Sequence, residues 1–207
     1  MPLKINMPPS LQARKRQLVQ DAIWDAAIDL FGRKGYDETT VDEIVAAAGV
    51  SPRSFFRYFA SKSDLMARGV IEYGGAITSA IDACPVTWPI SKVFRHTVLQ
   101  VATDMAARPR TRKSIAVGTK HPAARAAELA RLPEVQERIA KAYARRKGGG
   151  DELTPMLLAG LTVHVIGVAL LSWSAQAGQD IGKTASRALD AVDRILGTAR
   201  PALRDRR

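Results

Sequence analysis

The feature that most constrains this fold is a run of 27 consecutive residues without Asp, Glu, Lys or Arg, residues 153–179. It is long enough for a membrane-spanning helix, which needs ~20 mainly apolar residues. Pro155, His164 and the polar end from Ser174 onward are unfavourable inside a bilayer. A helix that is apolar on most sides is equally typical of a buried core or dimer helix. We therefore expect burial within protein, with a membrane span as the alternative.

Hydrophobic residues recur at helical spacing along nearly the whole chain, and no segment alternates as a strand does. The expected helices cover residues 11–34, 40–48, 51–59, 61–73, 91–107, 109–118, 121–147, 151–177 and 180–198. Gly74 and Gly75 are expected to end or bend the fourth helix, and Pro133 to break the seventh. The pattern predicts an all-α fold of about nine helices without a sheet.

Local capping signals define two short helices joined by a glycine turn. Thr40 and Glu43 have the spacing of a capping box, and Gly49 can adopt the left-handed turn that ends the first helix. Ser51 is the expected N-cap of the second helix, which begins with Pro52. Two such helices within residues 40–59 are typical of a helix-turn-helix, whose second helix enters the DNA major groove.

The second of these helices has two distinct faces. A helical wheel places Phe55 and Phe59 toward a small core. The opposite face and its flanks carry candidate DNA contacts: Arg53, Ser54, Arg57, Phe56 and Tyr58. Outward arginines suit guanine edges or phosphates, because the guanidinium fork matches two acceptors at once. Lys62 and the N-caps Ser51 and Thr40 complete a candidate phosphate clamp.

Several motifs occur in a fixed order and spacing: residues 27–31 (AIDLF), 35–36 (GY), 39–41 (TTV), 44–45 (IV), 48–51 (AGVS) and 59–65 (FASKSDL). With them, residues 17–66 resemble the N-terminal DNA-binding domain of the TetR family of bacterial regulators. The positions that match the family's DNA contacts are Thr40, Ser51, Pro52, Arg53, Ser54, Phe56, Tyr58 and Lys62. Phe56 stands where the family often has tyrosine, so a phosphate hydrogen bond through that hydroxyl is lost, and Arg57 is an additional base.

The resemblance implies three regions: a basic N-terminal arm (1–16), a three-helix helix-turn-helix domain (17–66), and a C-terminal helical bundle for effector binding and dimerisation (67–207). Arg14, Lys15 and Arg16 either contact the DNA backbone or belong to a disordered terminus. The implied function is that of a cytoplasmic homodimeric repressor, which a small-molecule effector releases from a near-palindromic operator. Residues 151–177 and 180–198 would form the dimer interface, and their apolar patterns support this independently.

The sequence constrains the effector-binding residues less than it constrains the DNA contacts. The candidates are polar or aromatic residues of the C-terminal region: Trp88, Phe94, His96, Met105, Tyr143, His164 and Trp173, with core packing as the alternative for each. His164 is expected to be a buried core histidine or an effector contact. The basic cluster 108–113 fits a solvated surface, an anionic effector site or a DNA-proximal contact. Asp21, Asp25 and Asp29, spaced four residues apart, are expected to form a solvated face.

Other classes of function find little support. The chain has one cysteine, three widely spaced histidines and no phosphate-binding loop or catalytic motif, so we expect no enzyme activity, metal or cofactor. The net charge of +11 indicates a polyanionic partner, yet residues 1–68 hold ten basic and eight acidic residues. Placement is more informative, because residues 44–63 hold three bases and no acid. A membrane-tethered or a nonspecific DNA-binding protein is the alternative.

Overall fold

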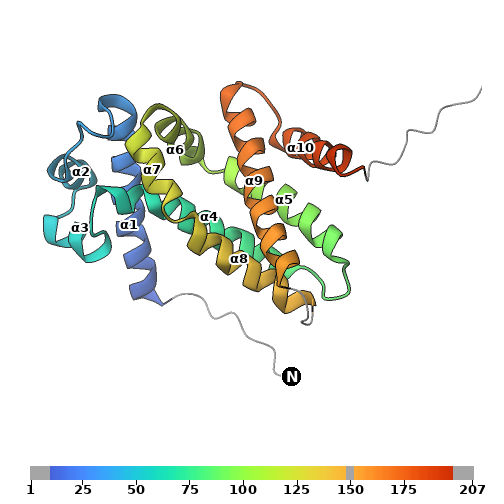
Figure 1. Cartoon of the computed structure of the whole chain (residues 1–207). Coiled ribbons are helices and arrows are strands. Elements are labelled where there is room, and N and C mark those ends of the chain that lie inside the picture. The colour runs from blue at the N-terminus through green and yellow to red at the C-terminus, as the bar shows by residue number, and fades with distance from the viewer. Residues whose placement is uncertain (1–9, 148–151, 198–207) are drawn as a thin grey trace, which may run out of the picture.

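The structure, a computed structural model, describes residues 10–147 and 152–197, and within them the chain forms ten α-helices and no strand (Figure 1). The helices are α1 (Leu11–Lys34), α2 (Val41–Ala48), α3 (Pro52–Tyr58), α4 (Lys62–Ala83), α5 (Ile90–Ala106), α6 (Pro109–Lys120), α7 (Pro122–Leu129), α8 (Leu132–Lys147), α9 (Leu153–Ala175) and α10 (Ile181–Ile195). The all-α prediction is confirmed. The additional helix arises because residues 121–147 are divided before Pro133, between α7 and α8.

α4 is longer than predicted, because Gly74 and Gly75 lie inside it. Gly74 is buried where α4 packs against α8, and a Cβ atom here would lie 2.4 Å from Cγ1 of Val135. The glycine therefore permits a close approach of two helices. The prediction that α4 ends at these glycines is wrong, because the reason for Gly74 lies in a contact distant in sequence.

The helices enclose two hydrophobic cores. The N-terminal core contains buried residues of α1, α2 and α3, including Phe31, Ile44 and Phe55. Val117 of α6 and Ala124 of α7 are buried in this same core, although they are distant in sequence from the helix-turn-helix. The C-terminal core gathers side chains of α4, α5, α8, α9 and α10. The N-terminal core therefore contains side chains of the helix-turn-helix and of the later helices α6 and α7. This core joins the N-terminal and C-terminal parts of the molecule.

α9 holds the uncharged run up to Ala175 and packs against α5, α8 and α10 (Figure 1). Its inner face is buried, with Thr162 Oγ1 2.9 Å from Tyr143 Oη of α8. By length and composition it could also cross a membrane, and less than half of its most apolar stretch is buried in the single chain. The remaining apolar face is exposed to solvent, as for Leu157 at 72% and Leu171 at 52%.

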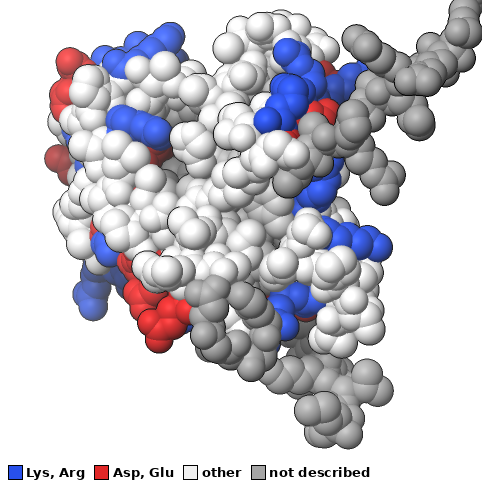
Figure 2. All heavy atoms as spheres, turned by 45° about the vertical axis from the view of Figure 1, so that its right-hand side comes forward, with Lys and Arg blue, Asp and Glu red and all other residues white. Residues whose placement is uncertain are grey.

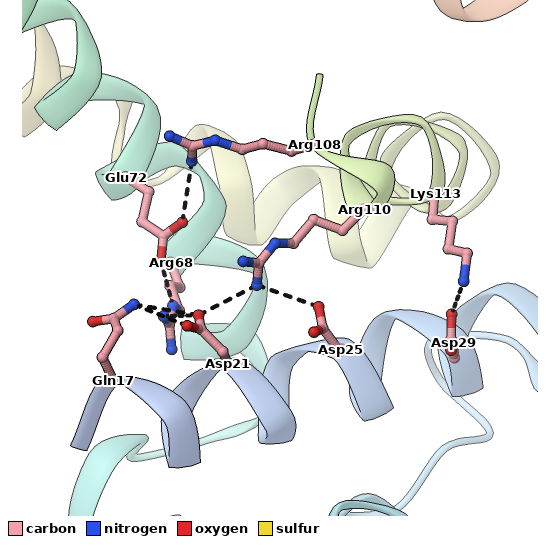
Figure 3. A network of polar contacts seen from close by, with 9 residues as sticks. All are labelled: Gln17, Asp21, Asp25, Asp29, Arg68, Glu72, Arg108, Arg110 and Lys113. Atoms are coloured by element: carbon pink, nitrogen blue, oxygen red, sulfur yellow. Dashed lines mark hydrogen bonds and ion pairs between the residues drawn. The ribbon is translucent and has the colours of Figure 1, made fainter. Parts of the chain in front are cut away.

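A row of ion pairs connects α1 to α4 and α6 (Figure 3). Its members are the pairs Arg68–Asp21 (2.8 Å), Arg110–Asp21 (3.3 Å), Arg110–Asp25 (3.2 Å), Lys113–Asp29 (2.6 Å), Arg68–Glu72 (2.7 Å) and Arg108–Glu72 (3.7 Å). The three aspartates were expected to form a solvated face; Asp25 and Asp29 are indeed exposed and Asp21 is half-buried, but all three carboxylates pair with basic side chains of α4 or α6. In the basic cluster 108–113, Arg108, Arg110 and Lys113 pair with Glu72 and the acidic face of α1, whereas Arg112 donates to the Ser174 carbonyl and lies over the Trp173 ring.

Candidate nucleic-acid interface

The helix-turn-helix forms as its capping signals predict. Thr40 and Glu43 make both hydrogen bonds of a capping box at the start of α2, and Gly49 ends this helix in the left-handed conformation, at φ 64°. Ser51 Oγ accepts a hydrogen bond from Ser54 N at 3.2 Å at the start of α3. These local bonds fix the angle at which α3 leaves the turn.

α3 presents one face to the core and the other to solvent. Phe55 is fully buried and Phe59 is 5% exposed, which confirms the predicted inner face. Arg53, Arg57 and Phe56 are exposed on the outer side, Phe56 at 59%. No acidic residue lies between Glu43 and Asp64. The exposed side of α3 is therefore basic and partly aromatic, as contact with phosphates and base edges requires.

Arg57 is held in place by its neighbour on α3. Its Nη2 donates to Tyr58 Oη at 2.8 Å, and its guanidinium carbon lies 4.7 Å from the centroid of the Tyr58 ring. This stacking restricts the rotamers of an exposed arginine and so lowers the entropy lost on binding a ligand. Arg57 and Tyr58 are thus brought together as one unit, whereas sequence alone placed them on separate parts of the helix surface.

Thr40 is engaged by its own capping box. Glu43 Oε2 accepts from Thr40 N at 2.9 Å and from Thr40 Oγ1 at 3.0 Å, and Glu43 also pairs with Lys34. The Lys34 ammonium, followed by these Thr40 bonds, lowers the pKa of Glu43 to about 2. Glu43 is therefore ionised near neutral pH, and its charge is offset by Lys34 at the start of α2.

Lys62, predicted to bind a phosphate, has its ammonium directed into the protein. Its Nζ donates to the carbonyl oxygens of Tyr36 at 2.5 Å, Asp37 at 3.2 Å and Thr39 at 3.0 Å. It also lies 4.5 Å from the centroid of the Tyr36 ring. Three acceptors match the three donors of an ammonium, so Lys62 fixes the loop before α2.

The basic arm is described only in part. Residues 1–9 lie outside the described residues, and Arg14, Lys15 and Arg16 form exposed positions of the first turns of α1. These three bases therefore extend from a helix rather than from a segment ahead of it.

The effector candidates lie at different depths in and around the C-terminal core. Phe94, Tyr143 and Trp173 are buried in the C-terminal core, Trp88 and Met105 are partly buried against it, and His96 lies edge-on to Trp88. His164 is exposed on α9, so the expectation of a buried core histidine is wrong for the single chain. One hollow in the described part of the chain lies between α9 and α10 and another between α1 and α6, and none of the seven candidates lines either of them.

The sequence did not predict the contacts that hold the helix-turn-helix part of the molecule against α4 and α6. Arg68 is 8% exposed and bridges Asp21 and Glu72, and its guanidinium lies over the rings of Trp24 and Phe59. The available signal was the four-residue spacing of three aspartates together with a distant cluster of opposite charge. Neither feature identifies its partner without the fold.

Comparison with known proteins gives consistent matches over both parts of the chain. Residues 23–68 match the family model described as bacterial regulatory proteins of the tetR family, and residues 88–197 match that of the MftR C-terminal domain. The regulator TcmR of Streptomyces glaucescens is 28% identical over 185 residues, covering 84% of this chain and 80% of TcmR. MftR of Mycobacterium tuberculosis, named as a mycofactocin biosynthesis regulator, is 29% identical over 161 residues, with 77% of this chain and 80% of MftR covered.

Solved structures share the same architecture. A TetR-family regulator of Syntrophomonas wolfei has a TM-score of 0.66 at 18% identity, over 92% of this chain and 98% of that one. A complex of SmeT with triclosan has a TM-score of 0.59 at 18% identity, over 91% and 98% of the two chains. At these identities the structures establish a common fold.

Proposed function

Because this chain belongs to the TetR family of bacterial transcriptional regulators, we propose that it represses transcription from a near-palindromic operator and leaves it when a small-molecule effector binds. Regulators of this family bind DNA and dimerise, and they are soluble cytoplasmic proteins. Repression, a near-palindromic operator and release by an effector go beyond these general properties of the family, and we propose them for this chain. The observation that carries it is the exposed basic side of α3, which is free of acidic residues.

We assign the DNA contacts to α3 and the two helix starts beside it. Arg53 and Arg57 read base edges or phosphates, and Phe56 contacts a thymine methyl group. Ser51, Pro52, Ser54 and Tyr58 lie on the same helix or at its start and complete the contact set, together with Thr40 and the backbone around Lys62. Residues 17–66 form the reader in this proposal, and residues 67–207 form the effector and dimer unit.

The second subunit is proposed to pack on α9 and α10. Along one side of α9, residues recur every three or four positions, which is the spacing of a helix-packing stripe. Leu153, Leu157, His164, Val168 and Leu171 are exposed, and Gly160 between them is half-buried. A second copy would cover these apolar side chains and bring two α3 helices to adjacent major grooves. Figure 2 shows the face that includes this side of the molecule, with broad areas free of charged side chains.

The effector is proposed to enter between the helices of the C-terminal core. Phe94, Met105, Tyr143 and Trp173 offer an apolar and aromatic lining, with Trp88 and His96 at its margin. Burial raises the pKa of Tyr143 to about 12, so this hydroxyl is uncharged and pairs with Thr162. An uncharged, largely apolar effector suits such a lining. The triclosan complex of the SmeT neighbour is consistent with a small aromatic molecule.

The proposal is tested by selecting duplexes from a random DNA library with the full-length protein and footprinting the selected sequence. We expect protection of one short symmetric site. The double change Arg53→Ala and Arg57→Ala should weaken binding to it by at least tenfold, because each lost bidentate contact removes about 1–3 kcal/mol of discrimination. A matched control, Arg138→Ala with Lys141→Ala on the exposed side of α8, removes the same charge and should bind as the unaltered protein does.

Two outcomes would contradict the proposal. Undiminished affinity in the Arg53 and Arg57 variant would exclude α3 as the reading helix. Broad protection without a preferred sequence would instead indicate a nonspecific DNA-binding protein.

A further inference from the structure

A hollow of about 380 Å³ lies where α1 meets α6. In Figure 1, α6 lies at the upper end of α1, whereas α3 lies lower in the view. The hollow is therefore separate from the proposed DNA-reading surface. It is also separate from the proposed effector pocket, since none of the C-terminal core aromatics lines it.

The hollow exists because small residues face each other across the two helices. Gly32 of α1 and Ala116 of α6 both line it, and a Cβ atom at Gly32 would have no neighbour within 4 Å. Its apolar surface is formed by the exposed residues Gly32 and Ala116, and beneath them lie Ile28 and Val117, which are each 1% exposed and belong to the N-terminal core. A ligand here would therefore contact a fixed apolar surface.

The rim of the hollow is strongly basic. Arg33, Lys113 and Lys120 line it, with His121 at the end of α6, and Asp29 is the one acid in the lining. The Asp29 carboxylate is already 2.6 Å from Lys113 Nζ. Arg33 Nε donates to the backbone carbonyl of Asp29, and no hydrogen bond or ion pair joins Lys120 to another described residue. Positive charge thus exceeds negative charge above an apolar floor.

We propose that this hollow binds a small amphipathic anion. Its acidic group is held by Arg33, Lys113 and Lys120, and its apolar ring or chain lies on Gly32 and Ala116, above the buried Ile28 and Val117. The volume falls within the range of small-molecule sites. Because Lys113 already pairs with Asp29, the bound anion competes with Asp29 for the ammonium and so acts on the contact between α1 and α6.

The test uses 1-naphthalenesulfonate as the probe and the uncharged 1-naphthalenemethanol as its comparison, each titrated into the full-length protein by isothermal calorimetry. We expect one sulfonate per chain and at least tenfold weaker binding of the alcohol. Gly32→Leu fills the hollow and should abolish binding. Gly75→Leu, at a helical glycine with equally open surroundings, is its control and should leave binding unchanged.

The charge is tested separately with Lys120→Gln, which should weaken sulfonate binding by about twofold to fivefold, the effect of an exposed ion pair. Arg138→Gln on α8 makes the same change of net charge elsewhere and should have no effect. Absence of binding to the unaltered protein would overturn the proposal. Equal affinity for the alcohol, or unchanged binding in both Gly32→Leu and Lys120→Gln, would also overturn it.

Discussion

Lys62 was predicted to bind a DNA phosphate, but its ammonium already donates to backbone carbonyl oxygens of the protein itself. At the start of a helix beside the recognition helix, a lysine is a natural phosphate ligand. Here its ammonium takes the carbonyl oxygens of Tyr36, Asp37 and Thr39, and it lies against the Tyr36 ring. The residue type and position were predictable from sequence. The direction of its side chain was not, because all three acceptors belong to a loop more than twenty residues away.

We predict that Lys62→Met lowers the stability of the protein. Methionine retains most of the aliphatic stem but leaves three carbonyl oxygens without their donor, so the free energy of unfolding should fall by about 2 kcal/mol. Urea unfolding followed by circular dichroism measures this change, with Lys141→Met on α8 as the control. Unchanged stability, combined with weaker operator binding and a salt dependence reduced by about one ion, would show that Lys62 binds phosphate instead.

At the scale of elements, prediction succeeded where the signals are local. The starts of α2 and α3 follow from Thr40, Ser51 and Pro52, which act within one turn of their own positions. It failed at Gly74, whose role depends on Val135 of another helix. The uncharged run behaves in the same way: its composition predicts burial, but which side of α9 is covered depends on the helices that pack on it.

The exposed stripe of α9 gives a prediction at this scale. Leu157→Glu places a charge among apolar side chains of the proposed dimer interface, so we expect a monomer by light scattering and loss of high-affinity operator binding. Helical circular dichroism should persist, because Leu157 is 72% exposed in the single chain. A Leu129→Glu variant, at an exposed leucine of α7, is the control and should remain dimeric. Dimerisation that survives Leu157→Glu would exclude this side of α9 as the interface.

At the scale of the whole molecule, the two units are joined by opposite charges. The acidic face of α1 and the basic cluster of α6 are both visible in sequence, but neither identifies the other as its partner. The aspartates were expected to be solvated, and the basic cluster fitted a solvated surface, an anionic effector site or a DNA-proximal contact. Burial distinguishes the pairs within this junction. The Arg68 side chain is 10% and that of Asp21 is 26% exposed, whereas Lys113 and Asp29 are 59% and 47% exposed.

This difference predicts unequal effects of the same substitution. Asp21→Asn removes the charge that faces Arg68 and Arg110 and should lower the free energy of unfolding by about 2 kcal/mol, less than for a fully buried pair. Asp29→Asn should cost less than about 1 kcal/mol, because its pair is exposed. Denaturant unfolding of the two variants in parallel measures both changes. Equal effects, or a larger effect of Asp29→Asn, would contradict this view of the junction.

Val117 and Ala124 complete the core of the DNA-reading unit from outside its sequence. For the design of chimeric regulators, a natural splice point directly after the helix-turn-helix would therefore remove two side chains from the reader that it transfers. In a chimera that exchanges only the N-terminal segment, the positions of Val117 and Ala124 are filled by residues of the recipient protein. The volumes of those residues do not match the donor's N-terminal core. A chimera that carries α6 and α7 along with the reader keeps the donor's complementary surfaces together, and modularity in this protein follows the core rather than the order of the chain.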